Sequence, residues 1–260
     1  MPREFTLVAV LILTAVRAGQ AQTPSTNADS QQAMPGMSNR KDMAMNDDDH
    51  SDAGAHVMHS MEGHMDMGPH MKMTSLRQAK PGDRERAQQV VEAARRAAEK
   101  YKDYHAALAD GFQIFLPNIP QKIYHFTNYG SAAEAEFHFN AEHPTSLLYE
   151  KRGNDYQLIG VMYTAPKRLT EDQLDERIPL SVAQWHEHVN FCAPPKDRRA
   201  ELFKPQPEFG LRGSITTQQA CDAAGGTFHP VIFNWMVHVY PFEKDQASMW
   251  SVERQHGKRD

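Results

Sequence analysis

The clearest pattern of hydrophobic and polar positions begins at Asp83. From there, apolar residues recur three and four positions apart, which is the spacing of one helix face. These positions are Ala87, Val90, Val91, Ala94, Ala97, Ala98, Tyr101, Tyr104 and Leu108. Gly111 then supplies a stop signal, because glycine commonly ends helices. The pattern predicts one long amphipathic helix at the start of the folded region.

Short apolar runs separated by Pro, Gly and Asn follow this helix and predict strands. The runs cover residues 122–129, 136–140, 146–151, 156–164, 181–191 and 231–242. Gly153-Asn154 predicts a hairpin turn, and Thr170-x-x-Gln173 predicts a capped, brief helix. The predicted fold class is α+β, with one long N-terminal amphipathic helix packed on a mainly antiparallel β-sheet.

Two of the predicted strands alternate in a way that separates apolar from polar side chains. Because side chains alternate across a strand, residues 182–192 place Trp185 on one face and His186 and His188 on the other. Residues 231–240 likewise place Trp235 opposite Met236 and His238. A packed sheet should bury the tryptophan faces. We therefore expect the histidines and Met236 to project together if the two strands are neighbours.

This juxtaposition predicts a metal site in the folded domain. Two imidazoles at positions i and i+2 of one strand, such as His186 and His188, can reach one ion at about 2.0–2.1 Å. His125, on a further predicted strand, is an additional candidate. The alternative is a solvated polar face without a ligand. For the remaining folded-region histidines we expect local hydrogen bonds or solvent exposure: His105, His138, His143, His229 and His256.

The N-terminus has the pattern of a secretory signal peptide. Arg3 precedes an apolar run over residues 5–16, and small residues follow it. We expect residues 1–21 to form a signal peptide cleaved after Ala21, with an uncleaved anchor as the alternative. The run is shorter than the roughly 20 residues that span a bilayer. The mature protein is therefore expected to be periplasmic or secreted and not membrane-spanning.

Residues 34–73, called here the Met/His segment, contain ten methionines and five histidines. Thioether sulfur favours Cu(I), and imidazole suits Cu(II) and zinc, so the mixture predicts copper binding, with zinc as the alternative metal. The candidate ligands are Met58, His59, Met61, His64, Met65, Met67, His70, Met71 and Met73. We expect residues 22–80 to be disordered, because they have too few large apolar side chains to fold. An inert linker is the alternative. The segment resembles Met/His-rich segments of bacterial periplasmic copper-resistance proteins.

The rest of the chain is expected to form a single α+β domain over residues 81–243, followed by a polar tail over residues 244–260. Cys192 and Cys221 are the only cysteines. In an exported chain an even pair predicts a disulfide, with a pair of thiolate ligands as the alternative. The net charge of −5 and the absence of a Lys/Arg stripe argue against nucleic acid as a partner.

Several motifs resemble a family of secreted bacterial proteins that has no established activity. They are the segment 93–111 ending in Ala-Asp-Gly, Tyr124-His125-x-x-Asn128, the segment 143–150 containing Pro-x-x-Leu-x-Tyr, the segment 158–163, and His188-Val189. The resemblance implies one domain and points to His125 and His188. Some members have Glu at the position of Met162. We therefore expect His125, His188 and Met162, with His186 or His238, to form a copper-selective pocket, since a thioether softens a metal site.

Three classes of function fit these observations. The first is a metal-binding protein that captures, stores or transfers copper to a partner protein of unknown identity. The second is a metal-dependent enzyme, either a copper oxidoreductase or a hydrolase, in which His186, His188 and His238 hold the ion and Glu187 serves as base. The third is a non-catalytic envelope domain with an inert linker. Because no nucleophile motif or phosphate loop is present, the sequence favours binding over catalysis.

Overall fold

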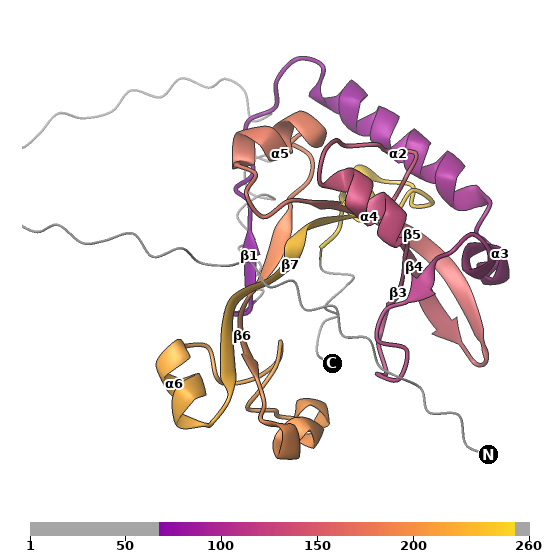
Figure 1. Cartoon of the computed structure of the whole chain (residues 1–260). Helices are drawn as coiled ribbons and strands as arrows, with labels where there is room; N and C mark the ends of the chain where they lie inside the picture. The colour runs from indigo at the N-terminus through magenta and orange to yellow at the C-terminus, as the bar shows by residue number, and fades with distance from the viewer. Residues whose placement is uncertain (1–67, 253–260) are drawn as a thin grey trace, which may run out of the picture. The chain divides into compact units, whose positions relative to one another are not determined.

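The computed structural model describes residues 68–252, which form a seven-stranded antiparallel sheet with several short helices (Figure 1). The strand order is β1-β6-β7-β5-β4-β3-β2. The strands are β1 (Met71–Met73), β2 (Gln113–Ile114), β3 (Tyr124–Thr127), β4 (Ser146–Arg152), β5 (Asp155–Ala165), β6 (His186–Ala193) and β7 (Thr227–Val239). The predicted signal peptide, the Met/His segment up to Met67, and residues 253–260 lie outside the described residues.

The helices are shorter than the sequence predicted. They are α2 (Asp83–Glu99), α3 (Tyr104–Ala109), α4 (Tyr129–Ala135), α5 (Glu171–Arg177), α6 (Gln218–Ala223) and α7 (Gln246–Met249), with a 3-10 helix, η1 (Lys196–Phe203). The fold is mainly β with helices, so the predicted α+β architecture dominated by one long N-terminal helix was wrong.

The predicted long helix is divided because Asp103 starts a second one. The Asp103 side chain accepts a hydrogen bond from the backbone N–H of His105 at 3.0 Å, which caps α3. Gly111 has a φ of 87° and follows α3 rather than α2. Apolar residues keep the same spacing across the break between α2 and α3, because both helices pack on the same core.

The sheet separates two cores. The larger one lies under α2 and α3 and contains alternate residues of the strands, including Phe126, Tyr149, Tyr163, Trp185 and Trp235. The opposite face carries a smaller cluster made of Ile123, Leu148, Met162, Met236 and Tyr240. The predicted alternation is therefore correct for β6 and β7, since both tryptophan faces are in the main core.

Other sequence signals are confirmed. β4 and β5 pair as a hairpin that closes at Arg152 and Asp155, with Gly153 at a φ of 63°. Thr170 and Gln173 form the capping box of α5. The residues 136–140, predicted as a strand, instead follow the end of α4. Asn128, the last residue of the Tyr-His-x-x-Asn motif, caps α4 by accepting hydrogen bonds from two backbone N–H groups.

The disulfide between Cys192 and Cys221 is confirmed. It lies beyond the main core, where α6 packs against the ends of the paired strands β6 and β7 that are remote from that core (Figure 1). Phe209 and Ile215 complete a small third cluster around it. Both cysteines are therefore structural, and the alternative of thiolate ligands is wrong.

Both boundaries of the domain lie further out than the sequence indicated. Residues 68–80 were predicted to be disordered, yet β1 pairs with β6, and Thr74 exchanges hydrogen bonds with Trp185. At the other end, Trp250 and Val252 are buried, and Trp250 belongs to the main core. The folded unit thus includes the last His-Met-x-Met repeat and part of the predicted C-terminal tail.

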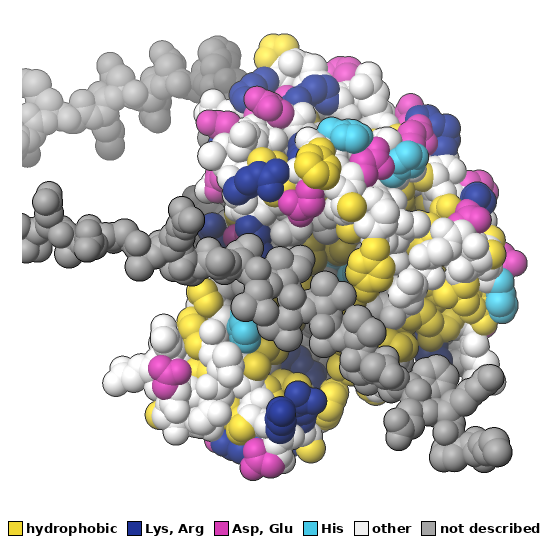
Figure 2. Space-filling model, in the orientation of Figure 1, with side chains coloured by type: hydrophobic (Ala, Val, Ile, Leu, Met, Phe, Trp, Pro, Cys, Tyr) yellow, Lys and Arg dark blue, Asp and Glu magenta, His cyan; other side chains and the backbone are white. Residues whose placement is uncertain are grey.

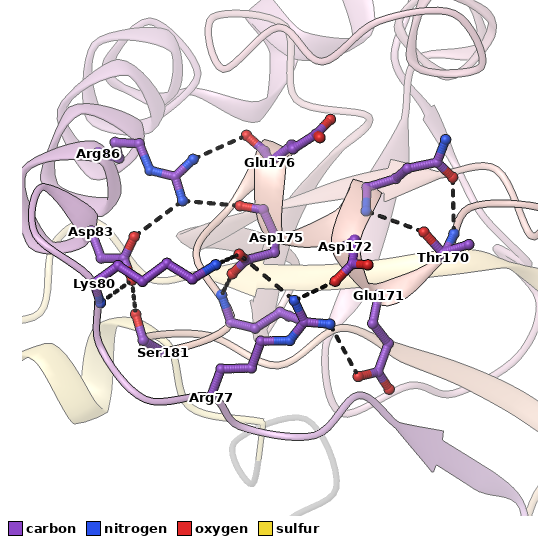
Figure 3. A network of polar contacts seen from close by, with 12 residues as sticks. Arg77, Lys80, Asp83, Arg86, Thr170, Glu171, Asp172, Asp175, Glu176 and Ser181 are labelled. Atoms are coloured by element: carbon purple, nitrogen blue, oxygen red, sulfur yellow. Dashed lines mark hydrogen bonds and ion pairs between the residues drawn. The ribbon is translucent and has the colours of Figure 1, made fainter.

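A network of polar contacts fixes the connection between β1 and α2 (Figure 3). Arg77 binds Asp172 at 2.7 Å, and Lys80 binds Asp175 at 2.8 Å, so that the connection is attached to α5. Asp83, at the start of α2, accepts hydrogen bonds from the Lys80 backbone and the Ser181 hydroxyl, which lower the pKa of its carboxyl group. This network holds the C-terminal end of β1 against the domain.

Candidate metal centre

Four histidines lie in a row on the sheet face opposite the helices. The ring centres of His125 and His238 are 5.8 Å apart. The ring of His238 is 5.1 Å from that of His186, which is 5.7 Å from that of His188. We call these four residues the histidine row. Two imidazoles that share one tetrahedral or trigonal ion at about 2.0–2.1 Å have ring centres about 5 to 6 Å apart. Each neighbouring pair has this spacing.

Four methionines lie beside the histidine row in the strand register. Met71 and Met73 of β1 are directly opposite His188 and His186. Met236 is opposite His186 on the other side, and Met162 is opposite His238. Cross-strand partners share a face, so imidazoles and thioethers alternate across the sheet. We call this surface the His/Met face; it comprises the histidine row with Met71, Met73, Met162 and Met236.

The His/Met face is buried rather than solvated. His186 and His238 are only 1% and 4% exposed, and His188, Met162 and Met236 are buried as well. His125, Met71 and Met73 are half-buried. The alternative of a solvated polar face is therefore wrong. Burial of so many polar rings is costly unless they have partners, and it gives this face an interior, low-dielectric character.

The sheet curves so that its distant strands meet over this face. β3 and β7 are separated by β5 and β4, which corresponds to about 14 Å at the usual strand spacing. His125 and His238 nevertheless approach to 5.8 Å between ring centres. Gly160 lies close to the Tyr240 ring, which borders His238 at 6.4 Å between ring centres: a Cβ at Gly160 would lie 2.6 Å from the Val239 carbonyl oxygen and 2.8 Å from the Tyr240 ring. Nothing in the sequence pattern indicated a role for Gly160 or Tyr240.

The electrostatic state of His125 suits metal binding. Burial lowers its pKa to about 4, and a hydrogen bond with the Ile123 backbone opposes this shift only in part. The ring is therefore neutral at pH 7. A metal ion binds the neutral form of imidazole, so no proton has to be displaced.

The expected single pocket is not formed. His125 and His188 were predicted to share one ion, but they lie at opposite ends of the histidine row. Within residues 68–252, no three His, Cys, Asp or Glu side chains are arranged to hold a metal ion together. A site on this face would consequently combine two imidazoles with thioether sulfur.

One other predicted ligand, His70, and the candidate base, Glu187, have different roles. His70 is buried, and its Nε2 is 2.7 Å from the carbonyl oxygen of Gly213, so it joins the chain before β1 to the loop before α6. Glu187, the candidate base, lies on the opposite strand face, 3.7 Å from Lys72, and burial raises its pKa. Neither side chain belongs to the His/Met face.

Aromatic side chains border the outer end of the row. Phe233 has a φ of 62°, in the left-handed region that few non-glycine residues adopt. It lies where the pairing of β6 and β7 shifts register, between His186 and His188 on β6. Its ring centre is 6.1 Å from His188 and 5.6 Å from Phe115. The register shift therefore turns an aromatic ring toward the histidines, which simple alternation could not indicate.

Local contacts or exposure, as expected, are found for His105, His138, His143 and His229: His229 is exposed, and the Nδ1 of His105 lies 2.9 Å from the Asp103 carboxylate. His138 and His143 each bind one carboxylate oxygen of Glu134, at 2.8 and 2.7 Å. The hydrogen bonds from His143, Asn140 and His138 lower the pKa of Glu134 to about 2. This cluster lies on the side of the sheet that the helices cover. On the face seen in Figure 2, acidic and basic side chains are interspersed.

No helix among the described residues is long and apolar enough to cross a membrane. Comparison of the chain with models of known protein families, with curated proteins and with solved structures finds no match. The residues of the His/Met face are therefore the best guide to function.

Proposed function

We propose that this chain is an exported copper-binding protein that holds Cu(I) on its His/Met face. The observation that carries this proposal is a sheet face on which three imidazoles pair with four methionines in the strand register, with a fourth imidazole, His125, 5.8 Å from His238 between ring centres. Thioether sulfur is a soft ligand that favours Cu(I). Export is supported by the signal-like pattern of residues 1–21.

The ligand set favours Cu(I) over zinc. Structural zinc is almost always held by four ligands drawn from Cys, His, Asp and Glu. Both cysteines are joined in the disulfide, and among the described residues no three of the remaining zinc ligands converge. Two imidazoles and a thioether are a poor set for zinc and a suitable one for Cu(I).

The Met/His segment supports the same function. Its last repeat, residues 70–73, is part of the sheet, so the sequence that is rich in soft ligands leads directly to the His/Met face. We propose that the remainder of the segment collects copper and that the domain retains it. Transfer onward to a partner protein stays a prediction of the sequence.

The test distinguishes copper binding by the domain from copper binding by the Met/His segment without truncating the chain. Replacing the eight methionines and four histidines of residues 34–67 by glutamine gives a protein that we call the silent-segment chain. Its Cu(I) affinity is measured by competition with a chromophoric chelator, alone and with His186→Asn plus His238→Asn. We expect tight binding that falls at least 100-fold in the double variant.

The matched control is His138→Asn plus His143→Asn, which removes two exposed imidazoles from the helical side. This control should leave Cu(I) affinity unchanged. Circular dichroism and the intact disulfide verify that each variant is folded. Equal affinity in all three proteins would contradict the proposal, as would the absence of any Cu(I) binding by the silent-segment chain.

A further inference from the structure

We infer that the His/Met face holds two copper ions at separate positions rather than one, an inference that rests on the proposed function. The histidine row has two ends with different strands and different thioethers. Its outer end is formed by β1 and β6, and its inner end by β3, β5 and β7. Each end combines a pair of imidazoles with at least one methionine.

The outer position is made by His186 and His188 with the methionines of β1. The two rings are 5.7 Å apart between centres and nearly perpendicular. Met73 pairs with His186 and Met71 with His188, so each imidazole has a thioether directly opposite it. Both methionines are half-buried, and both imidazoles are buried.

The inner position is made by His125 and His238 with Met162. The two rings approach to 5.8 Å from strands that are not neighbours, and Met162 lies directly opposite His238 on β5, one of the two strands between them. Met162 is 6% exposed and His238 is 4% exposed. The Tyr240 ring borders this position, with its centre 6.4 Å from that of His238.

One ion cannot serve both ends. His188 and His125 are separated in the row by His186 and His238, and each step between ring centres is at least 5.1 Å. Among the described residues no three His, Cys, Asp or Glu side chains are placed to hold one ion together, so an ion on this face reaches at most one pair of rings. The contact between His186 and His238 therefore links the two positions. Because the outer position adjoins the Met/His segment through β1, copper would enter there and pass inward.

The experiment follows the imidazole nitrogens of the silent-segment chain by NMR during titration with Cu(I) held by a competing chelator. We expect two tight equivalents, with one imidazole pair changing at a time. Met162→Leu plus His125→Asn should remove one equivalent and leave the changes at His186 and His188. Met71→Leu plus His188→Asn should remove the other equivalent and leave the changes at His125 and His238.

The outcomes distinguish this inference from the function that it rests on. A single tight equivalent that perturbs all four rings together, or that either double variant abolishes, overturns the two-position arrangement while the proposed function stands. No tight equivalent at all overturns both. The titration of the silent-segment chain with its histidine row intact decides between these outcomes even if a double variant fails to fold. The His138→Asn plus His143→Asn control should retain both equivalents.

Discussion

Met73 lies directly opposite His186 in the antiparallel pairing of β1 with β6. This pair joins the Met/His segment to the buried histidine row. It also shows that the last His-Met-x-Met repeat is an edge strand of the domain rather than part of a disordered tail. Several expectations for stability and copper binding follow from this arrangement.

Lys72 should secure β1 against β6. It lies opposite Glu187, with Nζ 3.7 Å from a carboxylate oxygen and 4.9 Å from the centre of the Trp235 ring. Lys72→Glu places like charges across the strands and should cost about 1 kcal/mol of unfolding free energy. Hydrogen exchange at the amides of residues 71–73 should accelerate. Lys72→Gln, which removes the charge without repulsion, is the control; equal exchange in the Glu and Gln variants would contradict this role.

Met162 should determine affinity for Cu(I) more than it determines stability. Met162→Leu conserves volume and should change the unfolding free energy by less than about 1.5 kcal/mol. It removes the thioether opposite His238 and should lower Cu(I) affinity at the inner position at least 10-fold. Met249→Leu, on α7 beside the main core, is the matched control and should bind like the parent. An unchanged affinity in Met162→Leu would show that this thioether is not a ligand.

Gly160 should not tolerate a side chain. A Cβ at this position would lie 2.6 Å from the Val239 carbonyl oxygen and 2.8 Å from the Tyr240 ring. Gly160→Ala should therefore destabilise the protein by about 1–3 kcal/mol through overpacking. It should also displace the Tyr240 ring, whose centre is 6.4 Å from that of His238, and so weaken copper binding at the inner position. Chemical denaturation measures the first effect. Gly153→Ala, at a φ of 63° in the hairpin turn, should also destabilise the protein but leave copper binding unchanged.

Glu134 should contribute to the way in which the unfolding free energy changes with pH in the acid range. Its pKa is lowered to about 2, mainly by the hydrogen bonds from His143 and Asn140, whereas an ordinary glutamate titrates near 4.5. A depressed carboxyl pKa stabilises the fold above the unfolded-state value, and this contribution is lost as pH falls from about 4.5 to about 2. Glu134→Gln should therefore be less stable than the parent at pH 6.

The two proteins should converge in stability near pH 2, where the carboxylate of the parent becomes protonated. Urea unfolding of both proteins between pH 2 and pH 6 measures this convergence. A constant difference across the whole range would mean that Glu134 acts through packing rather than through its charge.

The disulfide should contribute much of the stability of the region where α6 packs against the paired strands β6 and β7. Cys192 and Cys221 are 29 positions apart, a separation for which chain entropy suggests about 3 to 4 kcal/mol. Reduction should lower the unfolding free energy by this amount, with the change in hydrogen exchange concentrated around α6. Copper affinity of the His/Met face should persist under reducing conditions, because the cluster around the disulfide contains none of its residues.

The sequence predicted local features better than their assembly. Alternation placed Trp185 and Trp235 in one core, and it placed His186, His188 and His238 on the opposite face. The helix pattern missed the break at Asp103, because a capping residue can start a new helix without disturbing the apolar periodicity. The fold is therefore mainly β, whereas a fold dominated by one long helix had been expected.

The arrangement of the histidine row could not be predicted from alternation alone. His125 approaches His238 across two intervening strands, and strand spacing does not reveal such curvature of the sheet. Low apolar content suggested disorder up to residue 80, although Met71 and Met73 do show the alternation of a short strand. An edge strand of three residues draws its stability from β6 and from the contacts of Thr74, which lie far along the chain.

Copper X-ray absorption of the Cu(I)-loaded silent-segment chain tests the central claim most directly. We expect a mixed ligand shell, with nitrogen at about 2.0 Å and sulfur at about 2.3 Å. The sulfur contribution should decrease when Met71, Met73 and Met162 are replaced by leucine, while the nitrogen contribution remains. A shell of nitrogen and oxygen alone, or a sulfur contribution that the three substitutions leave unchanged, would contradict copper binding on the His/Met face.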